Sequence, residues 1–416
     1  MLSFCFSSLS LSAGESSIEK RLSELERVRF ENPLNGISLS GQMTLIYQSS
    51  DYSLHQNYTG SFTADLIVEK SFENGVFQID VQFANGEGVD ANAQGGAMVN
   101  NDIMENTDVH NQPYIAKAYY EHSFVLKDSL NFVIDIGKFG VNDFFDLGLG
   151  VSDQSTQFLN QAINNNGAFD FVQDLDGNGY TFGLRVALES DLYGVDLAAF
   201  SADSYLDNIS KKHSIIAAIK LTPEWSKGNK SLYQVYAFKN FGEYGVFQDD
   251  GSFITNDVNS INKAENADQN DKAGWGVSLN HVFEGGIDIF AKYGKQDDDR
   301  DVRHYQDMDE SIMFGFSKQG IGSARDQDAL GLAYHIGKLT GNHRLAHENG
   351  YNSFFDRSDG IGSENYADER VLEAYYRFSL SDYSSFSGNY QRFSNFNYNK
   401  MAESVVFYGM RYNLAF

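Results

Sequence analysis

Residues 60–84 read GSFTADLIVEKSFENGVFQIDVQFA, and this stretch decides the fold class. In its second half, apolar residues at 77, 79, 81 and 83 alternate with Gln or Asp at 78, 80 and 82. A period of two is that of a β-strand with one apolar face. Only Glu73 and Asn74, ahead of Gly75, separate this half from the segment before it, which is the length of a hairpin turn. The stretch therefore predicts two adjacent antiparallel strands.

The same alternation recurs along the chain and predicts sixteen strands. We expect them at residues 36–48, 60–72, 75–84, 113–126, 129–138, 179–189, 193–202, 212–222, 230–240, 273–283, 286–295, 310–318, 327–336, 366–378, 383–393 and 404–416. Each is close to the length that crosses a membrane when tilted, roughly 9–11 residues. The number is even, as a bacterial barrel with both ends on one side requires.

Short and long connections alternate between these strands. Turns of about two residues lie near residues 73, 127, 191 and 284, and long polar loops lie at 85–112, 139–178, 241–272 and 337–365. This alternation is typical of an outer-membrane β-barrel, which has short periplasmic turns and long external loops. Sixteen strands enclose a lumen too wide for side chains to fill, so the apolar faces must point to lipid. The loop at 139–178 is the longest, and we expect part of it to fold inward and narrow the lumen.

The two ends of the chain carry further signals. The last strand, SVVFYGMRYNLAF at 404–416, alternates apolar residues and ends on Phe416, which resembles the C-terminal signal that the barrel assembly machinery recognises. Residues 1–13 resemble the remnant of a signal peptide without its basic start, the alternative being a buried N-terminal strand. Residues 14–33 predict a short helix, at Ser16–Val28, and a linker; the helix is either a periplasmic or oligomerising element or a loosely docked tail. Residues 34–416 are then the barrel domain.

Composition excludes several classes of protein. The 416 residues carry a net charge of -26, which argues against nucleic acid as a partner because phosphate binding needs clustered Lys and Arg. No run of about 18 apolar residues occurs, so transmembrane helices are not expected. The single cysteine, Cys5, leaves the body of the chain without a disulfide or a thiolate metal site.

Several motifs together resemble the carbohydrate-selective porin family of Gram-negative outer membranes, the OprB-type porins. They are GK at 137–138 with NDFFD at 142–146 and QFL at 157–159, then FSKQGIGSARDQDALG at 316–331, ERVLEAYYR at 369–377, and the strand that ends at Phe416. The resemblance covers most of the chain after about residue 36. It departs at Ala324, where the family often has Gly, and near Ser384, where a family proline is absent.

The resemblance implies passive, selective diffusion of small neutral, glucose-like sugars through a water-filled barrel in the outer membrane, without chemistry. Strand parity predicts charged residues on the lumen face, where they would create a transverse field, and aromatic rings that could stack on sugars. The pore-lining candidates are Lys117, Tyr119, Glu121, Asp135, Arg185, Lys220, Lys292, Glu373, Tyr375 and Arg377, with Asp65, Glu69 and Asp80 on the same parity. For each of them, lining a wet channel is an alternative to direct contact with a sugar.

Other readings of the sequence stay open. The acidic balance also fits a general cation-preferring porin, and a barrel enzyme such as a lipase or protease is the alternative from another class. No catalytic residue, cofactor or metal site is expected: His343 and His347 are predicted to lie in a solvated external loop. The acidic run Gln296–Glu310 is either a solvated charge run or a site for divalent cations that bridge lipopolysaccharide. Lipid and lipopolysaccharide are expected neighbours, and monomer and homotrimer both remain open.

Overall fold

A computed structural model describes residues 36–52, 58–86, 88–89, 95–103, 112–127, 129–169, 180–202, 206–226, 229–242, 244–254, 271–301, 306–322, 325–351 and 365–416. The expected leader and the expected helix at Ser16–Val28 lie outside these residues. Every helix within the described ranges is too short and too polar to cross a lipid bilayer.

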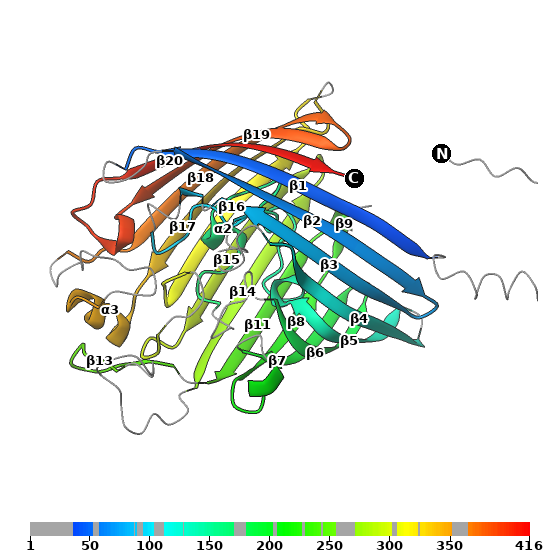
Figure 1. Cartoon of the computed structure of the whole chain (residues 1–416), viewed down its shortest axis with the longest axis horizontal. Coiled ribbons are helices and arrows are strands. Elements are labelled where there is room, and N and C mark those ends of the chain that lie inside the picture. The colour runs from blue at the N-terminus through cyan, green and yellow to red at the C-terminus, as the bar shows by residue number, and fades with distance from the viewer. Residues whose placement is uncertain are drawn as a thin grey trace, which may run out of the picture.

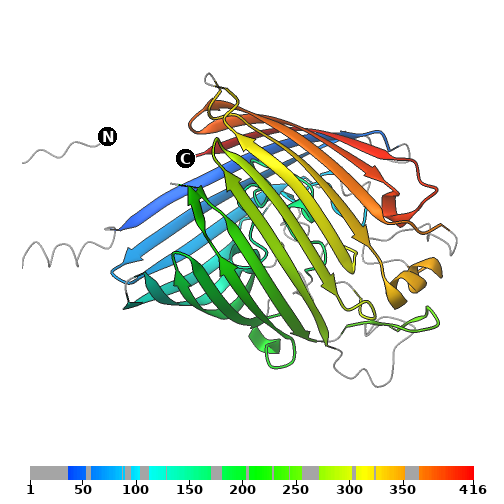
Figure 2. The same ribbon diagram turned by 180° about the vertical axis from the view of Figure 1, so that it is seen from behind.

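In the described part of the chain, sixteen strands close into one antiparallel barrel (Figures 1 and 2). They are β1 Ile37–Ser50, β2 Tyr58–Phe72, β3 Gly75–Asn85, β4 Tyr114–Lys127, β5 Leu130–Gly140, β6 Tyr180–Ser190, β7 Tyr193–Ser201, β8 His213–Leu221, β11 Leu232–Phe241, β14 Lys272–Phe283, β15 Ile287–Gln296, β16 Glu310–Gln319, β17 Ala329–Lys338, β18 Glu369–Ser381, β19 Ser384–Ser394 and β20 Val405–Ala415. The predicted barrel and its strand count are confirmed, and each predicted strand end agrees within three residues.

The remaining elements belong to the connections. They are the short strand pairs β9 Glu224–Ser226 with β10 Asn229–Lys230 and β12 Val246–Phe247 with β13 Phe253–Ile254, the helices α2 Gln161–Asn164 and α3 Gly341–Glu348, and 3-10 turns at Val141–Asp143, Leu206–Asn208 and Phe396–Tyr398. In Figure 1, α2 lies within the barrel, while α3 and β13 lie at the end that carries the long loops.

The barrel closes between its first and last strands. The two strands β1 and β20 pair from Gln42 with Ala415 to Ser50 with Phe407. Beyond the last paired strand residue, Gly41 and Phe416 exchange two backbone hydrogen bonds of 2.9 and 3.0 Å. Closure leaves neither strand with an unpaired edge, which is the condition for a sheet within lipid.

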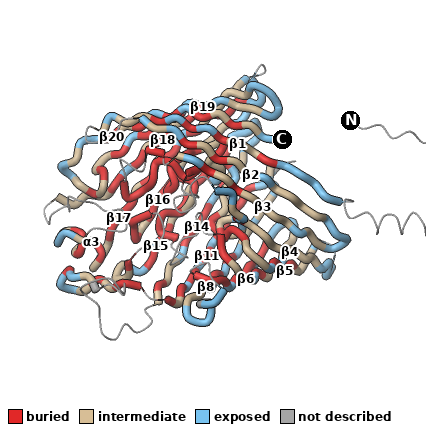
Figure 3. The backbone as a smooth tube through the Cα atoms, in the orientation of Figure 1, coloured by how far each residue is buried: buried red, intermediate tan, exposed pale blue. Residues whose placement is uncertain are grey.

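Apolar residues of the barrel wall point outward, as the alternation predicts. Leu184, Leu188, Ile219, Val235 and Ile289 are exposed, whereas their strand neighbours are buried or partly buried. In Figure 3 buried and exposed positions accordingly alternate along many strands. The exposed apolar band faces lipid, where its transfer from water is favourable.

Two loop segments fold into the barrel and pack against its inner wall. The first inward segment is residues 95–103, and the second inward segment is residues 141–169. The two segments join each other through the backbone bonds Asn101 N–H to Leu159 O, 2.8 Å, and Gln161 N–H to Met98 O, 3.1 Å. The inward course predicted for part of the 139–178 loop is therefore found, and the inward course of residues 95–103 is an addition.

The hydrophobic core of the protein lies inside the barrel. One cluster joins both inward segments to β15–β20 through Val99, Phe158, Ile163, Phe290 and Phe407. A second cluster joins residues Val141, Phe145 and Phe169 to the inner faces of β7, β8 and β11. These strands carry apolar residues on both faces because the inner face packs against the second inward segment. Much of the lumen on the β7–β20 side is therefore filled by protein.

Candidate functional site

Glu373 on β18 holds the second inward segment in place. Its Oε1 accepts a hydrogen bond from the Leu159 N–H at 2.7 Å and its Oε2 accepts one from the Asn160 N–H at 2.9 Å. Both groups are buried, and Asn389 adds a third, longer bond to Oε1. The neighbouring Tyr375 packs edge to face on Phe158 with ring centroids 4.9 Å apart. Two of the predicted lining residues therefore anchor a loop instead of meeting open water.

Lys292 on β15 anchors the same segment from another side of the lumen. Its ammonium group is fully buried and donates to Asp146 Oδ2 at 3.0 Å, to Asp146 O at 2.9 Å and to Asn164 O at 2.7 Å. A buried ammonium is stable only when its donors are paired, and this lysine pairs all three. Asp146 is the last residue of the NDFFD motif, so this motif helps to hold the second inward segment in its folded position.

Arg185 on β6 lies in a buried cluster of charges on the inner wall. It pairs with Asp135 at 2.6 Å, and also with Asp196 and Glu189. Its guanidinium carbon lies 4.2 Å from the centre of the Phe144 ring. Lys220 pairs with Asp196 at 3.0 Å and lies at the partly exposed edge of the cluster. Each of the three guanidinium nitrogens of Arg185 has a carboxylate partner, and Lys220 lies closer to solvent.

A polar cavity of about 250 Å³ lies between the inward segments and the wall formed by β1–β4 and the start of β6. Its lining residues are Gln42, Thr63, Asp65, Ile67, Asp80, Gln82, Asn101, Asp102, Lys117, Gly140, Asn142, Asp143, Asp146, Ser152, Gln154, Ser155, Asn165 and Tyr180. This is the side of the barrel that neither hydrophobic cluster fills. The polar cavity is the candidate site for a solute.

Hydrogen bonds fix the side chains that line the polar cavity. Lys117 pairs with Asp143 of the second inward segment, with Nζ 2.8 Å from Oδ2. Gln82 donates to the Tyr180 hydroxyl at 2.9 Å and accepts from the Tyr114 hydroxyl at 2.6 Å. A wall ordered in this way presents donors and acceptors at set positions. Solutes that form hydrogen bonds can exchange water for these groups.

Carboxylates dominate the charge of the polar cavity. Among its lining residues, five Asp side chains stand against the single cation of Lys117. The Asp102 carboxyl, in the first inward segment, accepts a 2.7 Å hydrogen bond from Thr63. Burial raises the pKa of Asp102 to about 7, although the Thr63 bond acts in the opposite direction. The net charge of the lining therefore changes near neutral pH.

The ten predicted lining residues lie at positions of two kinds. Five are buried within loop anchors or the arginine cluster: Asp135, Arg185, Lys292, Glu373 and Tyr375. The other five are partly exposed: Lys117, Tyr119, Glu121, Lys220 and Arg377. Of these, Lys117 borders the polar cavity, whereas Arg377 borders a second cavity of about 230 Å³ with Asp288 and Ser317.

Several residues of the polar cavity were missed by sequence reasoning. Asn101 and Asp102 belong to a loop predicted to be external, and its composition carries no signal for an inward course. Asp143 and Asp146 are part of NDFFD, so the motif marked them although its role was not assigned. Gln42 and Gln82 follow the strand parity and could have been included on that basis.

The two histidines are not solvated, contrary to expectation, and several carboxylates of the acidic run bind backbone groups. His343 and His347 lie on α3 and are buried, and their rings face Asp307. In the acidic run, Asp297 accepts from the Ala273 N–H, Asp301 from the Gly245 N–H and Asp309 from the Thr340 N–H. These carboxylates accept hydrogen bonds from backbone N–H groups of neighbouring loops; Asp301 and Asp309 are buried, whereas Asp297 is exposed.

A closed sixteen-stranded barrel with an apolar outer band, short turns at one end and inward loops that leave a polar cavity defines an outer-membrane porin. Residues 51–416 match the carbohydrate-selective porin, OprB family, and the chain belongs to this family. The family resemblance found from the motifs is thereby confirmed.

Solved structures share the fold. The high pH structure of Pseudomonas putida OprB has a TM-score of 0.74 at 14% identity, covering 94% of this chain and 97% of that chain. The low pH structure of the same protein has a TM-score of 0.50 at 12% identity, covering 99% and 100%. OmpT, an outer membrane protein of Vibrio cholerae, has a TM-score of 0.50 at 11% identity, covering 91% and 97%. A comparison with curated proteins found no match.

Proposed function

We propose that this protein lets small neutral, glucose-like sugars diffuse passively across the outer membrane through the polar cavity. Membership of the carbohydrate-selective porin family supports a sugar as the solute. The single observation that carries the proposal is the ordered polar wall, which offers the hydroxyls of a sugar both donors and acceptors. The transport is a channel function, and it needs no catalytic residue and no cofactor.

The ten candidate residues take two roles in this proposal. Lys117 and Tyr119 are the candidates for direct contact with a sugar. Glu121, Lys220 and Arg377 are candidates for lining the water-filled channel without contacting the sugar. Asp135, Arg185, Lys292, Glu373 and Tyr375 act indirectly, because they keep the wall and the inward segments in position. In this proposal, both inward segments together form the narrowest part of the pore.

A second candidate function, cation-preferring diffusion, is favoured by one observation. Five Asp side chains line the polar cavity, and Lys117 and the buried Lys292 neutralise two of them, Asp143 and Asp146. The remaining carboxylates, Asp65, Asp80 and Asp102, favour small cations over anions. The two functions are compatible, since a neutral sugar is insensitive to net charge while it still uses the carboxylates as acceptors.

The test is single-channel conductance in a planar bilayer, with glucose, a disaccharide and a neutral non-sugar polymer added in turn. Saturable block by a sugar at concentrations where the polymer has no effect supports the sugar site. Conductance that follows only bulk viscosity contradicts it and leaves the cation-preferring pore, and absence of conductance favours the barrel enzyme. Lys117→Met should weaken the block, whereas Lys239→Met removes a lysine that pairs with Asp271 and should leave it unchanged.

We also propose three partners: the barrel assembly machinery, lipopolysaccharide and further copies of this chain. The strand β20 and the following Phe416 would present the assembly machinery with its recognition signal, supported by the alternation of exposed Tyr408 and Met410 with buried neighbours. Lipopolysaccharide would surround the outer half of the wall. A homotrimer is tested by the mass of the detergent-solubilised protein in light scattering with correction for bound detergent.

A further inference from the structure

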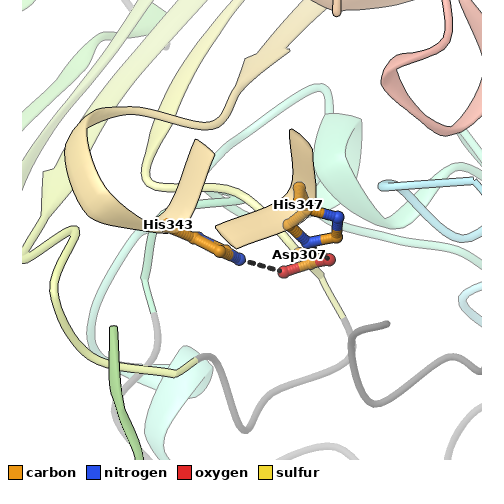
Figure 4. A group of neighbouring side chains, drawn as sticks. All are labelled: Asp307, His343 and His347. Atoms are coloured by element: carbon orange, nitrogen blue, oxygen red, sulfur yellow. Dashed lines mark ion pairs between the residues drawn. The ribbon is translucent and has the colours of Figure 1, made fainter. Parts of the chain in front are cut away.

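A buried cluster of two histidines and an aspartate lies at the end of the barrel that carries the long loops, outside the polar cavity. His343 and His347 are four residues apart on α3, which places both rings on one face of the helix. Asp307 comes from the connection that leads into β16. Figure 4 shows the two rings and the carboxylate turned toward one another. The cluster joins two segments far apart in the sequence.

The distances within the cluster are those of ligands around one ion. His343 Nε2 lies 3.2 Å from Asp307 Oδ1, and His347 Nε2 lies 3.3 Å from Asp307 Oδ2. One ligand atom from each residue falls within 4.8 Å of the other two. Ligands at 2.0–2.1 Å from a tetrahedral Zn²⁺ are about 3.3 Å apart. The contacts of His343 and His347 have this length, each to its own oxygen of Asp307.

A second carboxylate orients one of the ligands. Asp309 Oδ1 lies 2.8 Å from His343 Nδ1. A hydrogen bond at Nδ1 leaves Nε2 of the neutral ring as the coordinating atom, and Nε2 is the atom that faces Asp307. The other oxygen of Asp309 accepts the Thr340 N–H at 2.8 Å, which fixes the carboxylate itself. Metal-bound histidines in proteins have this type of outer partner.

Apolar rings shield the cluster from water. Phe247 stacks on the His343 ring with centroids 4.4 Å apart and an interplanar angle of 9°. Tyr351 lies edge-on to His347 at 5.4 Å. The cluster therefore places two carboxylates, Asp307 and Asp309, in a buried site that requires positive charge nearby.

We propose that Asp307, His343 and His347 form a binding site for a divalent transition-metal ion, with Zn²⁺ as the best fit. Two imidazoles and one carboxylate suit ions of intermediate softness, and they suit Ca²⁺ or Mg²⁺ poorly because these ions prefer all-oxygen sites. The role is structural. The Asp307 N–H donates to Gly96 O at 2.9 Å, so the ion would lock α3 to the first inward segment at the external mouth.

The test is calorimetric titration of the full-length protein in detergent, stripped with a chelator, with Zn²⁺ alone. The proposal requires one equivalent per chain. His347→Gln should weaken binding at least about 100-fold, and Asp309→Asn should weaken it about 10- to 100-fold, the range found for outer partners of metal ligands. Glu348→Gln is the matched control, because Glu348 lies on the same helix but bonds Arg344 instead of the cluster.

Two results would overturn the proposal: absence of saturable Zn²⁺ binding to the native protein, or binding of equal strength in His347→Gln and the native protein. Far-UV circular dichroism checks that each variant keeps its β-structure. If His347→Gln does not fold, Co²⁺ bound to the native protein replaces the variant as evidence. Intense visible absorption of tetrahedral Co²⁺ with nitrogen ligands supports the site, and the weak spectrum of hexa-aqua Co²⁺ contradicts it. Sugar block in bilayers is measured separately, so failure here leaves the proposed transport untouched.

Discussion

Glu373→Gln should loosen the second inward segment and widen the pore. In the native protein, both carboxylate oxygens of Glu373 accept backbone hydrogen bonds, from Leu159 and Asn160. The amide of Gln replaces one acceptor with a donor. One of the two buried N–H groups then loses its partner and faces an N–H₂ group instead.

The magnitude follows from the desolvation of that one group. An unsatisfied buried donor costs about 1–3 kcal/mol. This free energy shifts the equilibrium between docked and undocked segment by about 5- to 150-fold toward the undocked state. Barrel closure does not depend on this contact, because the sixteen strands pair through backbone hydrogen bonds alone.

Hydrogen exchange and bilayer conductance measure the two consequences. The amides of residues 159 and 160 should exchange faster by the same factor, and single-channel conductance should rise or fluctuate while sugar block weakens. Glu369→Gln is the matched control. Glu369 accepts hydrogen bonds from the Gly96 and Ala97 N–H groups, so this variant should speed amide exchange in the first inward segment instead. Unchanged exchange at 159 and 160 in folded Glu373→Gln would refute the anchoring role.

Three further predictions concern charge and backbone. The pKa of Asp102 is about 7, so its carboxyl is neutral below this pH and charged above it. The preference of the pore for K⁺ over Cl⁻ should therefore rise with pH through neutrality, and it should rise less in Asp102→Asn. Reversal potentials in bilayers that depend on pH equally in the native protein and in Asp102→Asn would contradict this. Arg185→Met leaves Asp135 buried without a cation and Asp196 with Lys220 alone, which should lower the free energy of unfolding in urea by about 3–5 kcal/mol. A loss under 1 kcal/mol, about the value of an exposed pair, would be inconsistent with this role. Gly137→Ala should reduce the yield of refolded barrel, because φ is +134° and an added Cβ would lie 2.4 Å from a neighbouring backbone oxygen; native-like yield would argue against strain there.

Most of the barrel was readable from local pattern. The alternation at 77–83 specifies both a strand and its two faces, and the two-residue turn at Glu73 and Asn74 specifies its partner. Sixteen repeats of this pattern are enough to predict a closed barrel, because each barrel strand pairs with the barrel strands that precede and follow it in the sequence. The family motifs could be recognised for the same reason, since they are contiguous in sequence.

The function of individual inward residues could not be read in the same way. Parity assigns Glu373 and Lys117 to the same face, yet Glu373 is buried under Leu159 and Asn160 while Lys117 borders the polar cavity. The difference depends on where a loop 214 residues away in the sequence folds. No local periodicity carries that information.

The sequence by itself determined the sheet, the order of its strands and the apolar face that they turn to lipid, because hairpins and a period of two are short-range properties. Only the tertiary structure decided which part of the lumen stays open, through the packing of two inward segments on β7–β20. It also brought Asp307 to the histidines of α3, from a strand connection separated from that helix by two strands. Such contacts depend on how loop side chains pack against the barrel wall and against one another, and residues far apart in the sequence supply them.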